Sequence, residues 1–473
     1  MDGILKKIFE YQYEDREAIV TSDGESISFR SLYQSCVALA LELENRNCSK
    51  NIILYTGNTI EYAIGLLAIW ITDRTAVLAD VRTGKKEIDA FLNCFESDTI
   101  IGSSMQVIEE INRNYIIPQK TKNDNSLKNK KITNELAIIF PTSGTTENPK
   151  YVQLTHKGII AECEALKAAH AFDMNTRELI VVPITSSCGT LGQLIPVLYS
   201  GGSLSIYKGD LNIARLYRTI RETKPNIIVC TSSILSLLVK GKDSVYSDFE
   251  SVKIIISAGE SSNISLFDIA KKKFDLDNII QCYGLTETSS ALAGFSVDKE
   301  APFESVGRIL PNFKVRIKME EEVLPPNKLG EIQVMGDSVT IGYYNDEYLT
   351  ERSFDEGWLK TGDIGCLDEH GYLYIKGRIK NIIVVSGKNV YAEEVESILT
   401  QNILIASAYV YGKKSNVTGE KVVAEVVLKE KGTIEVDGIR EFCNRNMVSY
   451  MVPRDIYIVE KQKINEAGKV SRK

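Results

Sequence analysis

Several features that define common protein classes are missing from this sequence. Its nine cysteines are scattered along 473 residues, with no Cys-x-x-Cys pair and no cluster of Cys and His. Because structural zinc sites need such ligands at close spacing, a zinc centre is not expected. Scattered cysteines in a chain of this size also favour a reducing compartment over secretion.

Signals for export, membranes and nucleic acid are missing as well. The first residues, MDGILKKIFEYQYEDREAIV, lack the apolar region of a signal peptide. No uncharged apolar run approaches the roughly 20 residues that a bilayer span needs. The net charge of −7 gives no basic footprint for nucleic acid. These absences predict a cytoplasmic protein that has neither a membrane nor a nucleic acid as a partner.

The length and pattern of the chain predict at least two domains. Between about residues 50 and 285, β-rich runs such as NIILYT, NIIVC and VKIIISAG alternate with helical patterns. Repeated units of this kind predict parallel sheets covered by helices. From about 303 to 376, short strands separated by Gly, Pro, Asn and Asp predict a small antiparallel or barrel-like subdomain.

After GRIKN (377–381), the pattern changes to strands and helices of a compact α+β unit. We place a domain boundary near Lys380, with a core domain over 1–379 and a C-terminal domain over 380–473. The predicted fold class is α/β. A large N-terminal domain of helix-covered parallel sheets, with a small β-rich subdomain, precedes a small α+β C-terminal domain.

One polar loop stands out at the end of an apolar run. PTSGTTENPK (141–150) is not a Walker A loop, because GxxxxGK[ST] is absent. Its hydroxyls, its glycine and its lysine nevertheless suit an anion such as phosphate. An ordinary surface turn rich in Ser, Thr and Gly has the same composition, so both interpretations are open for the loop alone. Its candidate phosphate contacts are Thr142, Ser143, Gly144, Thr145, Thr146 and Lys150.

The loop resembles the phosphate loop of the acyl-adenylate-forming superfamily, which includes acyl- and aryl-CoA synthetases, peptide-synthetase adenylation domains and beetle luciferases. Further signatures of that family follow in order: YGLTETSS, SVGRILPNFKVRI, GEIQVMGDSVTIGYYN, GWLKTGDIG, GRIKNIIVVSGKNVYAEEVE and EAGKVSRK. The resemblance covers essentially the whole chain. It implies that ATP and a carboxylic acid form an acyl-AMP and pyrophosphate, and that the acyl group then passes to a thiol.

The resemblance also assigns roles to individual residues. The loop would hold the β- and γ-phosphates of ATP, and Gly259 would lie at the nucleotide and acid pockets. Tyr283 would stack on adenine, Gly284 would leave room for the base, Thr286 would donate to the α-phosphate and Glu287 would bind Mg²⁺. Asp363 would bind the ribose, and Arg378 would contact the same ribose or the phosphates.

In the family, the C-terminal domain is mobile and turns between two half-reactions. The resemblance places Lys380 at the hinge. Lys469 would be the catalytic lysine presented to the carboxylate and the α-phosphate in the first half-reaction. Gly387 would line the channel of the incoming thiol in the second.

The acid pocket departs from the common pattern of the family. Many relatives have an aromatic residue and a histidine where PITSSCG (183–189) places Thr185 and Ser186. Amino-acid-activating relatives place an aspartate here to pair with the α-ammonium, and PITSSCGTLGQLIPVL contains none. Because a buried, unpaired ammonium is costly, an uncharged acyl or aryl acid is favoured. The predicted pocket residues are Ser186, Ser187, Cys188, Gly189 and Gly259.

The thiol acceptor stays open between CoA and a phosphopantetheinyl carrier protein. GRIKNIIVVSGKNVYAEEVE is similar to fatty-acyl-CoA synthetases, whereas SAGE (257–260) resembles the GGE of peptide-synthetase domains. No cluster for the 3′-phosphate of CoA is recognisable. The main alternative is a stand-alone peptide-synthetase-type enzyme that activates an amino acid and loads a carrier protein. A luciferase-like oxygenase, which would also form the acyl-AMP and then oxidise it, is a weaker alternative that the motifs leave open. An inactive binding copy is disfavoured because the chain keeps Lys150, Glu287, Asp363, Arg378 and Lys469.

Overall fold

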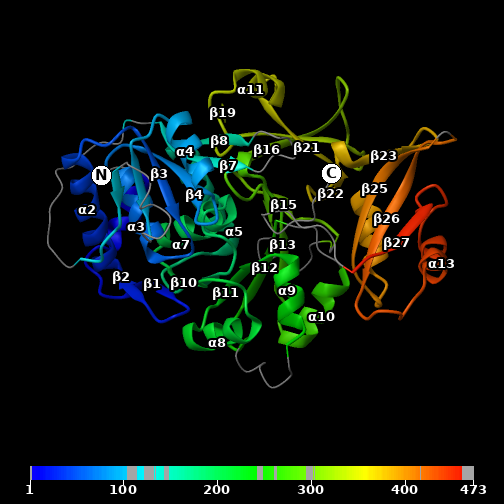
Figure 1. Cartoon of the computed structure of the whole chain (residues 1–473), viewed down its shortest axis with the longest axis horizontal. Helices are drawn as coiled ribbons and strands as arrows, with labels where there is room; N and C mark the ends of the chain where they lie inside the picture. Colours follow the sequence, from blue (N-terminus) through cyan, green and yellow to red (C-terminus); the bar gives the residue numbers. More distant parts are fainter. Residues whose placement is uncertain are drawn as a thin grey trace.

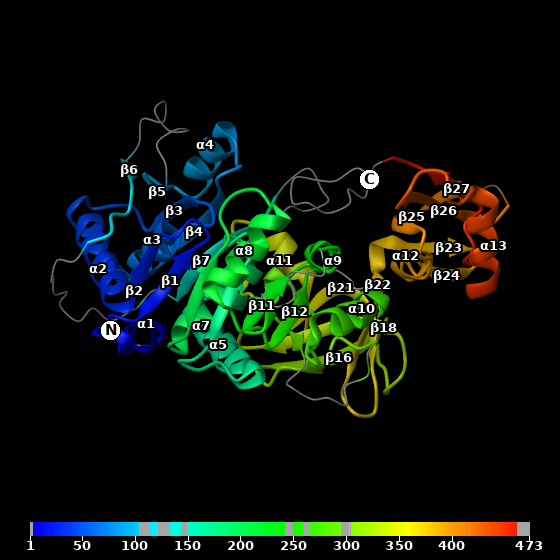
Figure 2. The same cartoon turned by 90° about the horizontal axis from the view of Figure 1, so that it is seen from below.

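The computed structural model describes residues 3–103, 114–121, 133, 135–142, 149–241, 249–259, 264–294, 302, 304–415 and 417–460. Two mainly parallel sheets form the N-terminal part, followed by an antiparallel sheet and then a C-terminal unit (Figures 1 and 2). We call them sheets I, II, III and IV.

Sheet I has the strand order β19-β8-β7-β4-β3-β5-β6. Neighbouring strands from β7 to β6 run parallel, whereas β7–β8 and β8–β19 are antiparallel pairs. β7 and β8 follow each other along the chain, and the predicted phosphate loop connects them. The bounds are β3 Asn51–Thr56, β4 Thr75–Asp80, β5 Thr99–Gly102, β6 Asn114–Ile116, β7 Leu136–Thr142, β8 Lys150–Thr155 and β19 Gly342–Tyr343.

Sheet II has the strand order β13-β12-β11-β9-β10-β1-β2. Its strands are parallel except for the antiparallel pair β1–β2, which the start of the chain contributes. The bounds are β1 Glu17–Thr21, β2 Ser26–Ser28, β9 Arg177–Ile180, β10 Ser203–Ile206, β11 Ile227–Cys230, β12 Ile254–Ala258 and β13 Ile279–Cys282.

Sheets I and II share one hydrophobic core. Helix α3 (Ile60–Ile71) is buried at every residue except Glu61, as expected for a helix without a polar face. Helices α1, α2, α5 and α7 complete this core, α4 covers the other face of sheet I, and α8 to α10 cover the other face of sheet II. The bounds are α1 Ile4–Ile8, α2 Phe29–Asn45, α4 Lys85–Cys94, α5 His156–His170, α7 Ile195–Tyr199, α8 Ile213–Thr223, α9 Ser232–Val239 and α10 Ile264–Phe274.

Sheet III is antiparallel throughout, as the sequence predicts. Its order is β17-β16-β18-β21-β20, with β22 paired to β21. The pair β14–β15 and helix α11 lie in the same part of the chain. The bounds are β14 Ala293–Gly294, β15 Arg308–Ile309, β16 Phe313–Met319, β17 Glu322–Val323, β18 Gly330–Gly336, α11 Glu347–Ser353, β20 Phe354–Asp355, β21 Trp358–Leu367 and β22 Leu373–Arg378.

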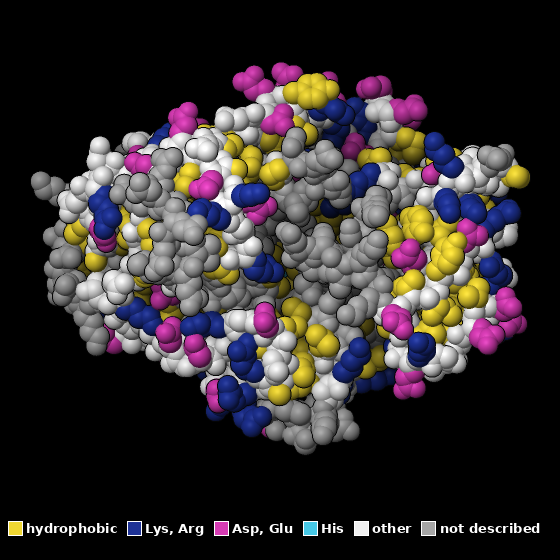
Figure 3. All heavy atoms as spheres, viewed as in Figure 1, with side chains coloured by type: hydrophobic (Ala, Val, Ile, Leu, Met, Phe, Trp, Pro, Cys, Tyr) yellow, Lys and Arg dark blue, Asp and Glu magenta, His cyan; other side chains and the backbone are white. Residues whose placement is uncertain are grey.

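The C-terminal unit has its own sheet and its own core. Sheet IV has the order β24-β23-β26-β25, with β27 paired to β26, and α12 and α13 pack on one face of it. Hydrophobic side chains gather over β25 to β27 on the face turned toward the viewer (Figure 3). The bounds are β23 Ile382–Val385, β24 Lys388–Tyr391, α12 Ala392–Thr400, β25 Ile405–Ser415, β26 Gly419–Leu428, α13 Val436–Asn446 and β27 Asp455–Ile458.

The predicted α/β fold class is confirmed. The separate core of sheet IV fits the boundary placed near Lys380, which stays a prediction. Within the described ranges, no helix combines the length and the apolarity that crossing a bilayer requires.

Candidate active site

The two ends of the predicted phosphate loop lie side by side at the end of sheet I. Thr142 ends β7 and faces Lys150, the first residue of β8, in the antiparallel register. The hydroxyl of Thr142 donates to the backbone oxygen of Lys150 over 3.3 Å. Ser143, Gly144, Thr145 and Thr146 lie outside the described residues. The loop therefore begins and ends at one point of the fold.

Lys150 and Glu287 are brought together by a tyrosine that the motif reading did not single out. Nζ of Lys150 lies 5.4 Å from the ring centroid of Tyr343. The hydroxyl of Tyr343 donates to Oε1 of Glu287 over 2.9 Å. Burial and the neighbouring Glu287 raise the pKa of Tyr343, so the hydroxyl keeps its proton. GYYN was visible as a motif, but its contacts depend on the pairing of β19 with β8.

Thr286 and Glu287 lie in a 3₁₀ turn (Thr286–Thr288) directly beyond β13. The turn is fixed by a hydrogen bond from Leu285 N to the hydroxyl of Thr288, at 3.0 Å. The backbone oxygen of Glu287 accepts from Thr340 N over 2.7 Å. The backbone oxygens of both predicted site residues are thus bonded, that of Thr286 to Ser289 N within the turn and that of Glu287 to Thr340 N.

The structure gives Gly284 a packing role of its own, and its predicted role at the adenine base stays a prediction. In the structure, a Cβ at this position would overlap the backbone oxygen of Ser290. The missing side chain therefore lets the segment after the 3₁₀ turn fold back against Gly284.

A buried glutamate on α5 holds that returning segment. Oε1 of Glu162 accepts from Ala291 N over 2.8 Å, and Oε2 accepts from Nδ2 of Asn312 over 3.0 Å. Burial raises the pKa of Glu162 to about 8, and the hydrogen bonds oppose this rise only in part. Sequence reasoning missed this residue, because one glutamate in a helical pattern carries no signal of its distant partners.

Asp363 and Arg378 form an ion pair between neighbouring strands. They face each other across β21 and β22, and Nε of Arg378 lies 2.6 Å from Oδ1 of Asp363. Oδ2 of Asp363 accepts from the hydroxyl of Tyr283 over 2.6 Å. Asp363 is buried, whereas the side chain of Arg378 is 42% exposed, so the pair joins a buried carboxylate to a cation at the surface. Burial raises the pKa of Asp363, and Arg378 and Tyr283 act against that rise.

The segment predicted to line the acid pocket reaches the 3₁₀ turn through Ser187. Its hydroxyl lies 3.3 Å from the hydroxyl of Thr286. Ser186 caps the short helix α6 (Ser187–Gly189), accepting from Gly189 N over 3.0 Å. Gly189 is buried, and a Cβ there would overlap the backbone of Pro183, so this glycine packs within its own turn.

The remaining pocket candidates lie on two separate elements. Cys188 is half-buried and lies against Gln193, whose Nε2 is 3.7 Å from the cysteine sulfur. Gln193 belongs to a π-helical turn (Thr190–Leu194), a feature often found at functional sites. Gly259 follows β12 with a φ of 80° and has open space where a side chain would lie. The assignment of these residues to an acid pocket stays a prediction.

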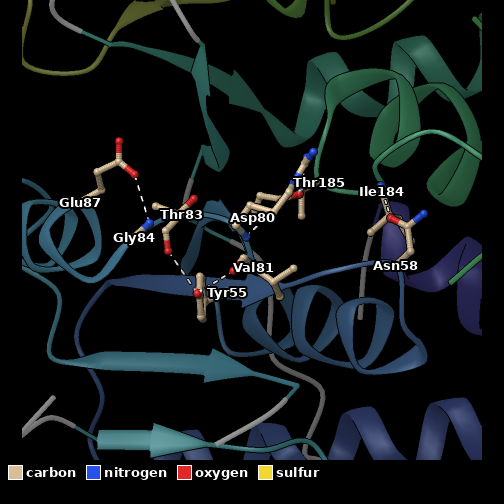
Figure 4. A network of polar contacts seen from close by, with 10 residues as sticks. Tyr55, Asn58, Asp80, Val81, Thr83, Gly84, Glu87, Ile184 and Thr185 are labelled. Atoms are coloured by element: carbon tan, nitrogen blue, oxygen red, sulfur yellow. Dashed lines mark hydrogen bonds and ion pairs between the residues drawn. The ribbon is translucent and has the colours of Figure 1, made fainter. Parts of the chain in front are cut away.

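Residues from sheet I anchor the start of the acid-pocket segment (Figure 4). Oδ1 of Asn58 accepts from Ile184 N over 2.8 Å, and its Nδ2 donates to the oxygens of Val182 and Tyr207, each over 3.0 Å. The hydroxyl of Thr185 donates to Oδ2 of Asp80 over 3.0 Å. The segment is therefore fixed by the loop after β3 and by the end of β4.

Asp80 places a carboxylate beside the acid-pocket segment, which contains no aspartate of its own. Its oxygens also accept from Arg82, with Nε at 2.6 Å and the terminal nitrogen at 3.2 Å. Burial acts to raise the pKa of Asp80, but the hydrogen bonds from Arg82 and Thr185 hold it below its usual value. The carboxylate is thus already paired with a cation of the protein.

The predicted hinge and thiol-channel residues lie on exposed turns. Lys380 is exposed in a 3₁₀ turn (Ile379–Asn381) between β22 and β23. Gly387 is exposed in the tight turn between β23 and β24, with a φ of 76° that favours glycine. Lys469 lies outside the described residues.

The donor chemistry of the site fits Mg²⁺. Glu287 supplies a carboxylate and Thr286 a hydroxyl, and Mg²⁺ prefers such hard oxygen ligands together with substrate phosphates. In the part of the chain that the structure describes, no group of three or more His, Cys, Asp or Glu side chains is arranged to hold a metal.

Comparisons with known proteins identify the family of the chain. The chain matches the AMP-binding enzyme family over residues 9–344 and the AMP-binding enzyme C-terminal domain over residues 394–469. The 2-succinylbenzoate–CoA ligase of Bacillus cereus is 27% identical over 97% of this chain and 95% of its own length. The oxalate–CoA ligase of Arabidopsis thaliana is 25% identical over 71% of this chain and 66% of its own.

Solved structures share the fold. The o-succinylbenzoate CoA synthetase of Bacillus subtilis, solved with its acyl-adenylate intermediate, superposes with a TM-score of 0.86 at 23% identity, covering 100% of this chain and 97% of that chain. ATP-bound MatB from Rhodopseudomonas palustris gives 0.89 at 20% identity, covering 99% and 97%. The chain therefore belongs to the AMP-binding enzyme family, the acyl-adenylate-forming superfamily that its phosphate loop resembles.

Proposed function

We propose that this ATP-dependent, AMP-forming acid–thiol ligase activates an uncharged acyl or aryl acid and transfers it to CoA. One observation carries the proposal. Tyr343 links Lys150 at the phosphate loop to Glu287, and the neighbouring Thr286 lies within hydrogen-bond distance of Ser187, a predicted acid-pocket residue. This chain of contacts supports a phosphate site next to the proposed acid pocket.

In the first half-reaction, a carboxylate oxygen of the acid attacks the α-phosphorus of ATP. The bond between that phosphorus and the oxygen of the leaving pyrophosphate breaks, giving acyl-AMP and pyrophosphate. Thr286 would donate to the α-phosphate and Lys150 would neutralise the leaving phosphates, where negative charge is spread over several oxygens. Glu287 would hold Mg²⁺, which supplies further charge neutralisation when bound.

In the second half-reaction, the thiol gives up its proton and its sulfur attacks the acyl carbon, expelling AMP. Asp363 and Arg378 would keep the ribose of AMP in place during both steps. Lys469, in the segment outside the described residues, is proposed to act only in the first step.

A hollow beside Gly387 favours CoA over a carrier protein. Its volume is 570 Å³, and it is lined by Val384, Gly387, Lys414, Ser415, Thr418, Gly419 and Glu420. Lys414 offers a cation and Ser415 a hydroxyl to a phosphate, whereas the hydroxyl of Thr418 already donates to the backbone oxygen of Glu420. CoA carries a 3′-phosphonucleotide at the far end of its pantetheine, whereas a carrier protein has only the phosphopantetheine. The relatives described above are named as CoA ligases, which supports the same acceptor.

The proposed acid is uncharged apart from its reacting carboxylate. Ser187 and Cys188 offer neutral walls, and the carboxylate of Asp80 already pairs with Arg82, so it does not offer a free partner for an ammonium. Among the similar structures is an anthranilate CoA ligase solved with anthranoyl-AMP, the adenylate of an aryl acid that has no second carboxylate. The o-succinylbenzoate of another similar structure keeps a second carboxylate after activation, so diacids belong in the panel as a contrast. An aryl acid is therefore a good first member of the panel.

The acid is tested by ATP–pyrophosphate exchange with a panel of acyl, aryl and amino acids. We expect exchange with aryl or acyl acids and little with proteinogenic amino acids. Strongest exchange with an amino acid would support the alternative, an adenylation enzyme that loads a carrier protein.

The acceptor is tested by thioester formation with CoA, with dephospho-CoA and with a phosphopantetheinyl carrier protein. Lys414→Ala is expected to raise the KM for CoA several-fold and to leave the KM for dephospho-CoA nearly unchanged. Lys413→Ala is the matched control, because the next residue of a strand points to the opposite face and does not line the hollow. Equal effects of the two variants, or faster transfer to the carrier protein, would exclude this CoA site.

A further inference from the structure

Tyr343 touches two residues of opposite charge in the proposed phosphate site. Its ring faces Nζ of Lys150 at 5.4 Å, and its hydroxyl donates to Oε1 of Glu287 at 2.9 Å. Only 6% of Tyr343 is exposed. Because a buried ring has little freedom, both contacts are held by a rigid group and not by a surface side chain.

The backbone explains why the tyrosine lies there. Gly342 and Tyr343 form β19, which pairs with Gln153 and Val152 of β8, the strand that Lys150 begins. The pairing sets the tyrosine beside the start of β8. A sheet register is a discrete arrangement, so the distance between Lys150 and the ring is set by the strands.

The same short segment also holds the backbone of Glu287. Thr340 N donates to the oxygen of Glu287 over 2.7 Å, and the hydroxyl of Thr340 donates to the oxygen of Gln153 over 2.7 Å. Thr340 thus binds the backbone of Glu287, and Tyr343 binds its side chain. Both hydrogen bonds come from the segment 340–343, which is itself paired with β8.

The tyrosine separates charges that would otherwise attract each other. In the described part of the chain, Lys150 forms no ion pair with a carboxylate, and its ammonium rests on the ring of Tyr343. A direct Lys150–Glu287 pair would have to break before phosphates and a metal could bind between them. The ring of Tyr343 holds the ammonium of Lys150, and its hydroxyl holds the carboxylate of Glu287, so both side chains stay in place without a direct ion pair.

We propose that Tyr343 is a positioning residue that sets Lys150 and Glu287 for the phosphates and their metal. The inference rests on the proposed function. The tyrosine hydroxyl fixes one oxygen of Glu287 and leaves the other for Mg²⁺. The ring holds the ammonium of Lys150 at the end of the phosphate loop.

The test separates the ring from the hydroxyl. Tyr343→Phe keeps the ring over Lys150 and removes the anchor of Glu287. Tyr343→Leu removes both contacts. Tyr344→Phe is the matched control, because Tyr344 is the next residue along the chain and its ring packs against Phe95 at 4.9 Å, away from Lys150 and Glu287.

The readout is binding of a non-hydrolysable ATP analogue, measured by calorimetry with and without Mg²⁺. Tyr343→Phe is expected to bind the metal-free analogue with the affinity of the parent protein. The increase in affinity that Mg²⁺ causes should be about tenfold smaller in this variant, because the free energy of a hydrogen bond to a charged group corresponds to a factor of this size. Tyr343→Leu should also weaken metal-free binding several-fold. Tyr344→Phe should change neither value.

The outcomes distinguish this inference from the proposed function. If the parent protein binds no ATP analogue and shows no pyrophosphate exchange, the proposed function fails. If the parent binds with a clear gain from Mg²⁺ and Tyr343→Phe keeps the whole gain, the positioning role of Tyr343 is wrong and the function stands.

A double-variant cycle covers the case in which Tyr343→Phe is less stable. In a Glu287→Gln background, the Tyr343→Phe change should no longer affect the dependence on Mg²⁺. If Tyr343→Phe lowers the affinity in the Glu287→Gln background as much as it does in the parent protein, the substitution causes a general structural defect and the inference is overturned.

Discussion

Arg378 donates to one oxygen of the Asp363 carboxylate at 2.6 Å, while the hydroxyl of Tyr283 donates to the other at 2.6 Å. Both oxygens of the predicted ribose ligand are therefore oriented before any nucleotide arrives. The ribose hydroxyls meet a carboxylate that is already fixed in place.

Asp363→Asn should weaken binding of an ATP analogue by about 10- to 100-fold, because the charged acceptor and its pairing with Arg378 are lost together. Calorimetry measures the affinity. Asp355→Asn is the control, since Asp355 also pairs with an arginine at 2.6 Å but lies on β20 outside the site. A similar loss in both variants would mean that Asp363 is needed for folding and not for the ribose.

Gly284→Ala should destabilise the protein by about 3 kcal/mol, because the added methyl group overlaps the backbone oxygen of Ser290 and the backbone must shift to admit it. Gly294→Ala, on the neighbouring strand, places its methyl group 3.8 Å from the sulfur of Cys282, which is an ordinary contact. Denaturant unfolding compares the two. Equal stability of both variants would contradict the close backbone approach at Gly284.

The two half-reactions should respond to different variants. Lys469→Ala should slow pyrophosphate exchange by about 10²- to 10³-fold and still form thioester from supplied acyl-AMP. Gly387→Trp should block thioester formation and leave exchange nearly intact. Gly432→Trp controls for strain, since Gly432 has a similar φ of 81° and open space around it. If Lys469→Ala and Gly387→Trp lose both activities equally while folded, the mobile-domain proposal is wrong.

Glu162 should make stability fall as the pH rises from about 4 to about 8. Its pKa of about 8 in the folded protein lies above the value of roughly 4.3 for an unfolded glutamate. The folded state therefore binds this proton more tightly, and its contribution is fully present below pH about 4 and lost as the pH rises through about 8. Glu162→Gln should lose less stability than the parent protein between pH 6 and pH 9 in urea unfolding. An equal loss in both would contradict a protonated Glu162.

The order of strands and helices was predictable because it depends on local pattern. NIILYT, NIIVC and VKIIISAG form β3, β11 and β12, and each of these strands is followed by a helix. Their aliphatic runs have no alternative to burial in a parallel sheet. The antiparallel character of 313–378 followed equally from its short strands and frequent turns.

The assembly of sheets was not predictable in this way. Nothing local in Glu17–Thr21 shows that β1 pairs with β10, a strand that begins only at Ser203. The partnership of Thr185 with Asp80 and that of Glu162 with Ala291 are of the same kind. Such contacts are decided by how the layers pack, so a motif can identify Glu287 without identifying Tyr343, which positions it.

The pairing of β19 with β8 has a consequence for the synthesis of the chain. The hydroxyl of Thr340 and the oxygen of Gln153 that it contacts are 187 residues apart. At a ribosome speed of about 5–20 residues per second, roughly 10 to 40 s separate their emergence. During that interval β8 is an edge strand with unpaired backbone groups, which can pair with other nascent chains. Shortened chains that stop before β19 are therefore expected to aggregate through sheet I.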